Sequence, residues 1–268
     1  MGSPLRRLHF VVAVVLTISA ANAQTMPTIT TTNNNDAWLE VIPIDLAHQG
    51  VLPSAVHGLS SELPPGAFLL RNKTATAVTV IVAKWIFTDS SGASQERRIY
   101  CDAYLTTHID PLINGNDSAL ITPDGSVREE YVGRLKTQNF LGSPLGSPHN
   151  TELLKATDRI AGVKISIDSV IFADGQIWGP DNLQYYKTLM KRQLIRQSVA
   201  DEVIAAQNAG EEVLTRLNKI QNEAGSNKDK TSAERGYYAR LIQKSPNPEG
   251  TLHWLQQNPL PDFHHIGE

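Results

Sequence analysis

The sequence has a single cysteine, Cys101, among its 268 residues. A lone cysteine excludes an internal disulfide and the paired cysteines of zinc and redox sites. Because Cys101 lies in the strand-like run RRIYCDAYL, we expect it to be a small buried core residue rather than a nucleophile or an intermolecular bridge. The fold must then be stabilised by an ordinary hydrophobic core.

Long apolar runs are scarce, and the main one, VVAVVLTISA, follows Arg6 and Arg7 near the N-terminus. It is shorter than the roughly 20 residues of a membrane span, and Ala21-Asn22-Ala23 supplies the small residues of a signal-peptidase site. The sequence predicts a signal peptide over residues 1–23, with a short N-terminal membrane anchor as the alternative. We therefore expect an exported protein, periplasmic or extracellular, with no stable membrane span after cleavage.

An excess of basic residues is also missing. The net charge is −3, and removal of residues 1–23 takes away Arg6 and Arg7 and no acid, which leaves 22 basic and 27 acidic residues, a net charge of −5. Binding to nucleic acid requires a basic surface that neutralises phosphates. The composition therefore predicts no nucleic-acid partner.

Catalytic motifs are missing too: the chain has no Gly-x-Ser-x-Gly, no His-x-x-x-His and no phosphate-binding Gly-x-x-x-x-Gly-Lys. We expect a non-enzymatic protein without a cofactor or a bound metal. A hydrolase with a dispersed active site is a remaining alternative, for which the candidate histidines are His57, His108 and His253. A C-terminal group of metal-ligand types is interpreted as adventitious, because adjacent histidines in a proline-rich tail are poorly preorganised: Asp262, His264, His265 and Glu268.

Five segments follow from the distribution of turn residues and apolar periodicity. Short apolar runs rich in β-branched residues, separated by Gly and Pro, are typical of an antiparallel β-sandwich. Steps of three to five between later apolar residues indicate amphipathic helices with a break at Gly210, and we assign the charged residues, Arg192 and Arg196 among them, to a mixed-charge face outside the apolar stripe. The predicted segments are a signal peptide (1–23), a flexible linker (24–36), a β-sandwich (37–180) with a long loop insertion near 127–159, an amphipathic helical segment (181–245) and a Pro-rich extended tail (246–268).

Trp85 lies in the strand-like run AVTVIVAKWIF, which is apolar on both faces and therefore suits a central strand. With this buried tryptophan, the pattern of residues 37–178 resembles a bacterial immunoglobulin-like or fibronectin-type module, although the paired cysteines that flank such a tryptophan in antibody domains are absent. The resemblance implies an immunoglobulin-like β-sandwich and no particular activity. The expected fold class is mainly β plus α, with this sandwich followed by a C-terminal helical segment.

The stretch VIFADGQIWGPDN, residues 170–182, raises the question of a ligand loop. Its acids, Asp174 and Asp181, lack the closely spaced oxygen ligands of a calcium loop. We interpret Asp174-Gly175 as a two-residue hairpin turn in which both residues have positive φ, and Asp181 as the cap of the following helix.

These observations predict an exported binding or assembly protein that contacts a protein partner or a second copy of itself through the C-terminal helices. A carbohydrate- or metal-binding module is the alternative, with the sugar platform formed by exposed aromatics. The candidate contact residues are Trp178, Tyr185, Tyr186, Asp174 and Asp181.

Overall fold

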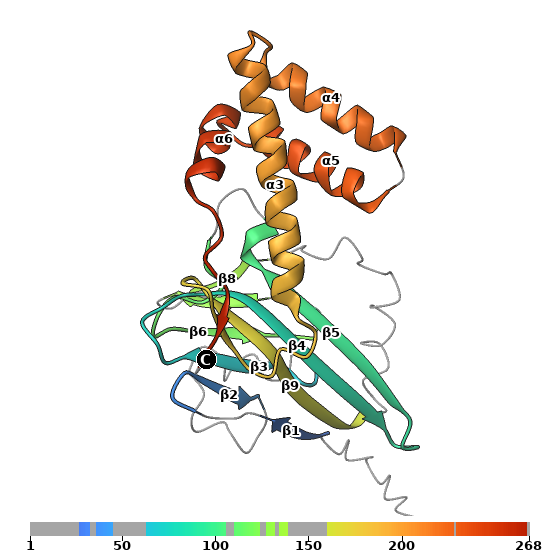
Figure 1. Ribbon diagram of the computed structural model, residues 1–268. Coiled ribbons are helices and arrows are strands. Elements are labelled where there is room, and N and C mark those ends of the chain that lie inside the picture. The colour runs from blue at the N-terminus through green and yellow to red at the C-terminus, as the bar shows by residue number, and fades with distance from the viewer. Residues whose placement is uncertain are drawn as a thin grey trace, which may run out of the picture.

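The computed structural model describes residues 27–32, 36–44, 63–105, 110–123, 127–131, 134–138, 160–227 and 229–266 (Figure 1). The predicted signal peptide, Glu268, and the candidate histidines His57 and His108 lie outside these residues. The described chain forms two β-sheets followed by helices, so the expected mixture of β and α structure is confirmed.

The two sheets have six and five strands. The first has the order β11-β10-β9-β4-β5, with β1 pairing along another part of β9, and the second has the order β2-β3-β6-β7-β8. Their bounds are β1 Thr28–Thr32, β2 Leu39–Pro43, β3 Phe68–Asn72, β4 Val78–Asp89, β5 Ser94–Asp102, β6 Ser118–Ile121, β7 Val127–Tyr131, β8 Arg134–Gln138, β9 Ile160–Phe172, β10 Gln176–Trp178 and β11 His264–His265.

The inner faces of the two sheets share one hydrophobic core. Trp85 of β4 is fully buried, its ring centroid lies 5.8 Å from that of Phe68 in β3, and its Nε1–H donates a 2.8 Å hydrogen bond to the carbonyl of Gly66. Gly66 has φ 86°, and a Cβ there would lie 2.9 Å from the Trp85 ring, so only glycine fits. Cys101 is buried in the same core, as its sequence context predicted.

Most strand pairs are antiparallel, as expected, but two pairs are parallel. β1 runs parallel to β9, and β11 runs parallel to β10. The β1 strand also corrects the prediction of a flexible linker over 24–36: its sequence TITTT is β-branched at every position, which favours a strand where an open sheet edge is available.

Part of the predicted loop insertion belongs to the second sheet. β7 and β8 form an antiparallel hairpin that extends this sheet beyond β6, where sequence analysis placed a long loop near 127–159. The charged run Arg128-Glu129-Glu130 hid the strand, although charges are common on strands near a sheet edge. Residues 139–159 lie outside the described residues.

The stretch VIFADGQIWGPDN forms a hairpin between β9 and β10, but its turn has three residues rather than two. The Gly175 N–H donates to the Phe172 carbonyl at 3.0 Å, and only Gly175 has a positive φ, at 90°, whereas Asp174 does not. A type I turn followed by a glycine in the left-handed region gives this geometry. A Cβ on Gly175 would lie 2.2 Å from the Asp262 carbonyl, so the C-terminal tail also requires glycine here.

The helical part consists of helices whose bounds are α3 Tyr185–Asn208, α4 Val213–Ser226, α5 Lys230–Gln243 and α6 Pro248–Gln257. The break between α3 and α4 falls at Gly210, as predicted. The expected cap at Asp181 is wrong: α3 begins at Tyr185, and Asp181 has φ 44°. Instead, the Asp168 carboxylate accepts the N–H groups of Asn182 and Leu183, at 3.1 and 3.2 Å.

Helix α6 lies in the region predicted to be an extended tail. Asn247 accepts a 2.9 Å hydrogen bond from the Gly250 N–H, and Pro248 occupies the first turn. An N-cap asparagine followed by proline is a helix start, and the high proline content of the tail obscured it. After α6 the chain returns to the sheet and ends its described part as β11 (Figure 1).

Helix α3 joins the two parts of the molecule. Its first turns pack on the outer face of the first sheet, where Tyr185 and Leu189 contact Val80 and Ile171, and its later turns pack with α4–α6 through residues such as Val203. Figure 1 shows α3 rising from the sheet toward the other helices. Among the described residues, every helix is too short or too polar to cross a bilayer.

Candidate functional site

The candidate site is the junction where α3 meets the end of β5. Strand β5 is followed by the 3₁₀ turn Ala103–Leu105, and the Asp102 carboxylate begins this turn by accepting a 2.8 Å hydrogen bond from the Tyr104 N–H. The turn places Tyr104 against Leu189 of α3. Polar side chains from the sheet and from the helices therefore meet at a buried position.

Asp102, Tyr185 and Arg192 form one hydrogen-bonded group in this junction. The Asp102 Oδ2 accepts hydrogen bonds from the Tyr185 hydroxyl, at 2.9 Å, and from Arg192 Nη1, at 3.1 Å, and Arg192 Nη1 also donates to the Tyr185 oxygen at 2.8 Å. Tyr185 stacks on Tyr100 with a centroid distance of 5.0 Å. The group links α3 to β5 in a fixed orientation, because each donor has its acceptor.

Burial governs the protonation of this group. The Asp102 side chain is wholly buried, which raises the pKa of its carboxyl, while Arg192 and the Tyr185 hydroxyl oppose that rise. Burial also raises the pKa of the Tyr185 phenol well above its ordinary value, with the negative charge of Asp102 adding to the effect. The phenol is therefore a permanent hydrogen-bond donor to Asp102.

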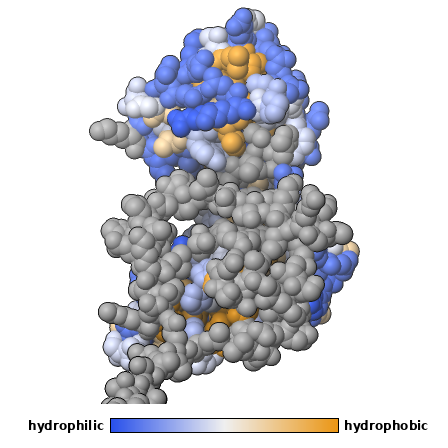
Figure 2. Space-filling model, turned by 180° about the vertical axis from the view of Figure 1, so that it is seen from behind, coloured by the Kyte–Doolittle hydropathy of each residue, from blue (hydrophilic) through white to orange (hydrophobic). Residues whose placement is uncertain are grey.

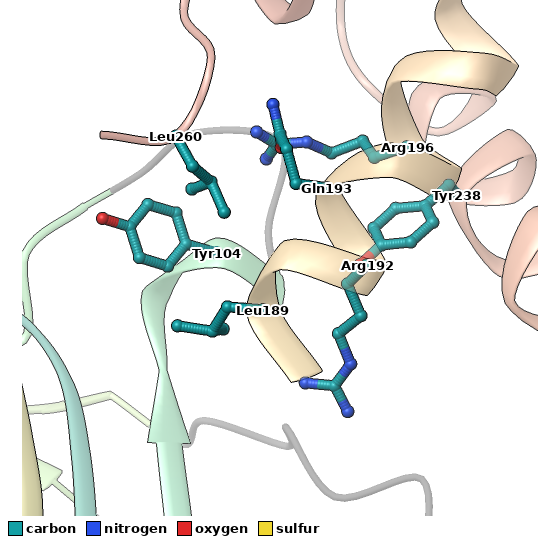
Figure 3. A pocket seen from close by; sticks show the side chains of 7 residues that line it. All are labelled: Tyr104, Leu189, Arg192, Gln193, Arg196, Tyr238 and Leu260. Atoms are coloured by element: carbon teal, nitrogen blue, oxygen red, sulfur yellow. The ribbon is translucent and has the colours of Figure 1, made fainter. Parts of the chain in front are cut away.

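A pocket lies beside this group, which we call the junction pocket. Its empty volume is about 190 Å³ with open solvent included, and about 10 Å³ of it is enclosed. Its wall comes from the turn after β5, from α3, from α5 and from the tail (Figure 3). The lining residues are Tyr104, Leu189, Arg192, Gln193, Arg196, Tyr238 and Leu260.

Arg196 is the unusual member of the lining. Its side chain is almost fully buried, at 2% exposure, yet neither Nη1 nor Nη2 has a hydrogen-bond partner. The neighbouring Gln193 Oε1 is buried without a partner as well. Burial lowers the pKa of the Arg196 guanidinium, because the charged form loses its hydration. A buried, uncompensated charge destabilises a fold by several kcal/mol, so its presence requires an explanation.

A second buried polar group lies where the tail joins the sheet. The Asp181 carboxylate is buried and 3.6 Å from His265 Nε2, and neither of its oxygens makes a hydrogen bond that meets ordinary geometric limits. Burial raises the pKa of the Asp181 carboxyl, and the nearby His265 opposes the rise. The Ser169 hydroxyl is buried beside Asp181, and its interaction with the carboxylate also opposes the rise in the pKa.

The residues predicted from sequence are distributed over different environments. Asp174 is exposed in the hairpin turn, where it accepts the Gln176 N–H at 3.2 Å. Trp178 is 8% exposed and its Nε1–H donates to Asp36, so it offers no open ring face for a sugar. Tyr186 is half-buried against Phe263 and His265. Of the predicted residues, only Tyr185 belongs to the junction.

The C-terminal candidates for a metal site do not converge. His264 and His265 are successive residues of β11, so their side chains point to opposite faces of the sheet. Within the described residues, no group of three or more histidine, cysteine or acidic side chains is placed to hold a metal ion. Of the three candidate hydrolase histidines, the described one, His253, is exposed on α6.

Sequence analysis missed both arginines, because it assigned them to a mixed-charge outer face of the helix. The signal was present: Tyr185, Leu189, Arg192, Arg196, Val199 and Val203 follow one another at steps of four and three. Residues at this spacing share one face of a helix. An arginine that falls on the apolar face of a helix is therefore a candidate for a buried polar site.

Comparison of this chain with protein-family models, curated proteins and solved structures finds no significant match.

Proposed function

We propose that this chain is an exported, non-enzymatic binding protein in which an immunoglobulin-like pair of sheets is the scaffold and the junction pocket is the ligand site. One observation carries the proposal: Arg196 is buried in the wall of the pocket with both Nη atoms unpaired. Proteins pair their buried charges, and an unpaired one persists where a ligand completes it. Export rests on the predicted signal peptide over residues 1–23.

The position of the pocket supports a binding role. Its wall is assembled from four separate parts of the chain, and ligand sites are common where two structural units meet. Tyr104 and Tyr238 present aromatic surface, and Arg196 and Gln193 present polar groups. Apolar walls with a small number of polar groups are typical of binding pockets.

A pocket-filling variant tests the proposal. Leu260→Trp adds a large ring to the tail side of the pocket, and Leu214→Trp, at a position 49% exposed on α4, is the matched control. Thermal unfolding is followed with a panel of neutral sugars, amines, carboxylates and phosphates. We expect at least one class to raise Tm for the wild type and the control but not for Leu260→Trp. Failure of every class, or an equal response of Leu260→Trp, contradicts a binding role for the pocket.

Assembly through the helices is a second candidate function, favoured by exposed apolar residues on α3. Met190 and Leu194 lie one turn apart and are 51% and 71% exposed. In Figure 2 the helical part carries apolar surface among mostly hydrophilic residues. The occupant we propose is a second copy of this chain. Lys187 and Asp201 are exposed seven residues on either side of Leu194, so antiparallel pairing of two α3 helices about Leu194 sets each lysine against an aspartate.

The molar mass in solution tests this assembly. We expect a dimer for the wild type and a monomer for Leu194→Asp, which places two acidic groups at the centre of the pair, while Leu214→Asp on α4 keeps the dimer. Light scattering after size-exclusion chromatography makes the measurement. A monomeric wild type, or a dimer that Leu194→Asp leaves intact, contradicts the proposal.

A further inference from the structure

We infer that Arg196 and Gln193 bind a small oxyanion, a carboxylate or phosphate group, in the junction pocket. The inference deepens the proposed function and rests on it, because it names the chemistry of the ligand that the pocket takes. It follows from three properties of the pocket: an unused donor set, a local excess of positive charge and a small volume.

The donor set is that of an anion site. Arg196 presents a planar guanidinium whose two Nη atoms are free of protein partners, a geometry that matches the paired oxygens of a carboxylate or a phosphate. The Gln193 amide lies next to it on α3 with its acceptor Oε1 buried and unpaired, and a half-turn of the amide brings its NH₂ donors to that position. Figure 3 shows the Arg196 guanidinium beside the Gln193 side chain and near Leu260, whereas Arg192 extends in another direction. The two arginines therefore serve different partners.

The other arginines near α3 have acidic partners. Arg192 pairs with Asp102, and both Arg216 and Arg235 pair with Glu202. Asp102 acts on Arg196 electrostatically, but its oxygens are already engaged by Tyr104, Tyr185 and Arg192. Among the described residues, no acidic side chain therefore forms a hydrogen-bonded pair with the Nη atoms of Arg196. A bound anion supplies a charged partner, and a neutral ligand does not.

The phenols of the lining add no negative charge to the pocket. Burial raises the pKa of Tyr238 and that of Tyr104 above the ordinary value of a tyrosine, so both remain neutral. The Tyr104 hydroxyl interacts with Thr79 and points away from Arg196 (Figure 3), so Arg196 remains the main donor of the site. The enclosed space of the pocket is about 10 Å³, roughly the room that one water molecule needs, so an anion that enters from the open side reaches Arg196 with a single oxygen.

Thermal unfolding with defined anions tests the inference. The purified protein is titrated with sodium phosphate, sodium sulfate and sodium acetate at constant ionic strength, with sodium chloride as the reference salt. Phosphate and sulfate also stabilise proteins generally by exclusion from the surface. The informative quantity is therefore the difference between the wild type and Arg196→Met. We expect a saturable rise in Tm for the wild type that Arg196→Met loses, with an apparent affinity about tenfold weaker or more.

Control variants separate the site from the surface. Arg240→Met removes the same charge from an exposed position on α5 and should retain the wild-type response. Gln193→Leu keeps the guanidinium and should show a partial loss. Arg196→Lys keeps the charge without the planar fork, so it should also bind the anion more weakly than the wild type. It replaces Arg196→Met in the test if Arg196→Met fails to fold. Acetate and phosphate in separate titrations distinguish a carboxylate ligand from a phosphate ligand.

Two results overturn the inference. Equal responses of the wild type, Arg196→Met and Arg240→Met to each anion would show that the stabilisation is a general salt effect. The second result is stabilisation by a neutral compound but by no anion, with the effect of the neutral compound lost in Leu260→Trp. This result would keep the pocket as a binding site and would show that its ligand is not an oxyanion. Absence of any response to any class contradicts both proposals.

Discussion

The first sheet has two faces, and they are covered in different ways. Its inner face meets the second sheet through apolar side chains, among which the Trp85 indole N–H has its own acceptor in the Gly66 carbonyl. Its outer face meets α3 through an apolar patch that also contains Asp102, Arg192 and Arg196. Burial of apolar surface stabilises the contact between the two sheets. The contact with α3 also depends on hydrogen-bonded partners for its buried charged side chains. The difference is consistent with the proposal that the inner face is the scaffold and the outer face holds the binding site.

Trp85→Ala is expected to have the largest effect on stability, because it opens a cavity between the sheets. Trp85 is fully buried, and truncation of a buried tryptophan destabilises a protein by about 3–5 kcal/mol. Urea unfolding gives the free energy of unfolding. Leu214→Ala, at a position 49% exposed on α4, is the control and should change it by less than about 0.5 kcal/mol. A small effect of Trp85→Ala would mean that the two sheets do not share a core.

Tyr185→Phe should have a smaller effect, because it keeps the ring and removes only the hydroxyl. That hydroxyl donates to Asp102 and accepts from Arg192, and loss of a hydrogen bond to a buried charge destabilises by about 1–3 kcal/mol. Tyr186→Phe, on the next residue of α3, is the matched control and should be close to neutral. If both variants unfold at the same urea concentration, the junction is held by apolar contacts alone.

Arg196→Met should stabilise the protein in a buffer without oxyanions. Replacement of a buried unpaired charge by an apolar side chain of similar length removes a desolvation penalty, and we expect a gain of about 1 kcal/mol. Arg235→Met, which leaves Glu202 with a single arginine partner, should instead lose stability. Loss of stability in both variants would place Arg196 among the paired arginines and contradict an empty binding site.

The smallest effect is expected for Asp181, as a change in the pH dependence of stability. Burial raises the pKa of this carboxyl in the folded protein, so the folded state binds the proton more tightly than the unfolded chain. The stability of the wild type relative to Asp181→Asn should therefore be greatest below the ordinary aspartate pKa of about 3.9 and should fall as the pH rises through the raised value.

Urea unfolding of both Asp181 proteins across this range measures the difference, and His265→Ala repeats it without the opposing imidazole, which lies 3.6 Å away. In that background the decline should be steeper. A difference that is constant with pH, or that grows as the pH rises, contradicts the burial of an ionisable carboxyl at this position.

Local patterns predicted the parts of this fold that depend on local physics. The run AVTVIVAKWIF predicted the central strand β4, and the apolar spacing after Pro180 predicted helices with a break at Gly210. The pair Asp174-Gly175 also predicted a hairpin turn at this position, although the turn has three residues rather than two. In each of these cases the determining contacts lie within a few residues along the chain.

The junction depended on contacts that sequence spacing does not reveal. Asp102 and Tyr185 are 83 residues apart, and only the packing of α3 on the end of β5 brings them together. The parallel pairing of β11 with β10 joins residues that are also distant in sequence, and a tail with many prolines gave no sign of it. The arginines were assigned to the solvent face because charge was given more weight than their position in the apolar repeat.

The return of the tail to the sheet has a consequence for biosynthesis. Leu260 completes the wall of the pocket, and His264–His265 complete the edge of the first sheet. The pocket and the sheet are therefore incomplete until these residues have been synthesised, long after β4, β5 and β9. Until residues 260–265 have been made, the nascent chain carries an open edge at β10 and the Arg196 pocket without its tail side. Unpaired strand edges favour pairing with other chains, so this interval is the one in which the growing chain is most prone to aggregation.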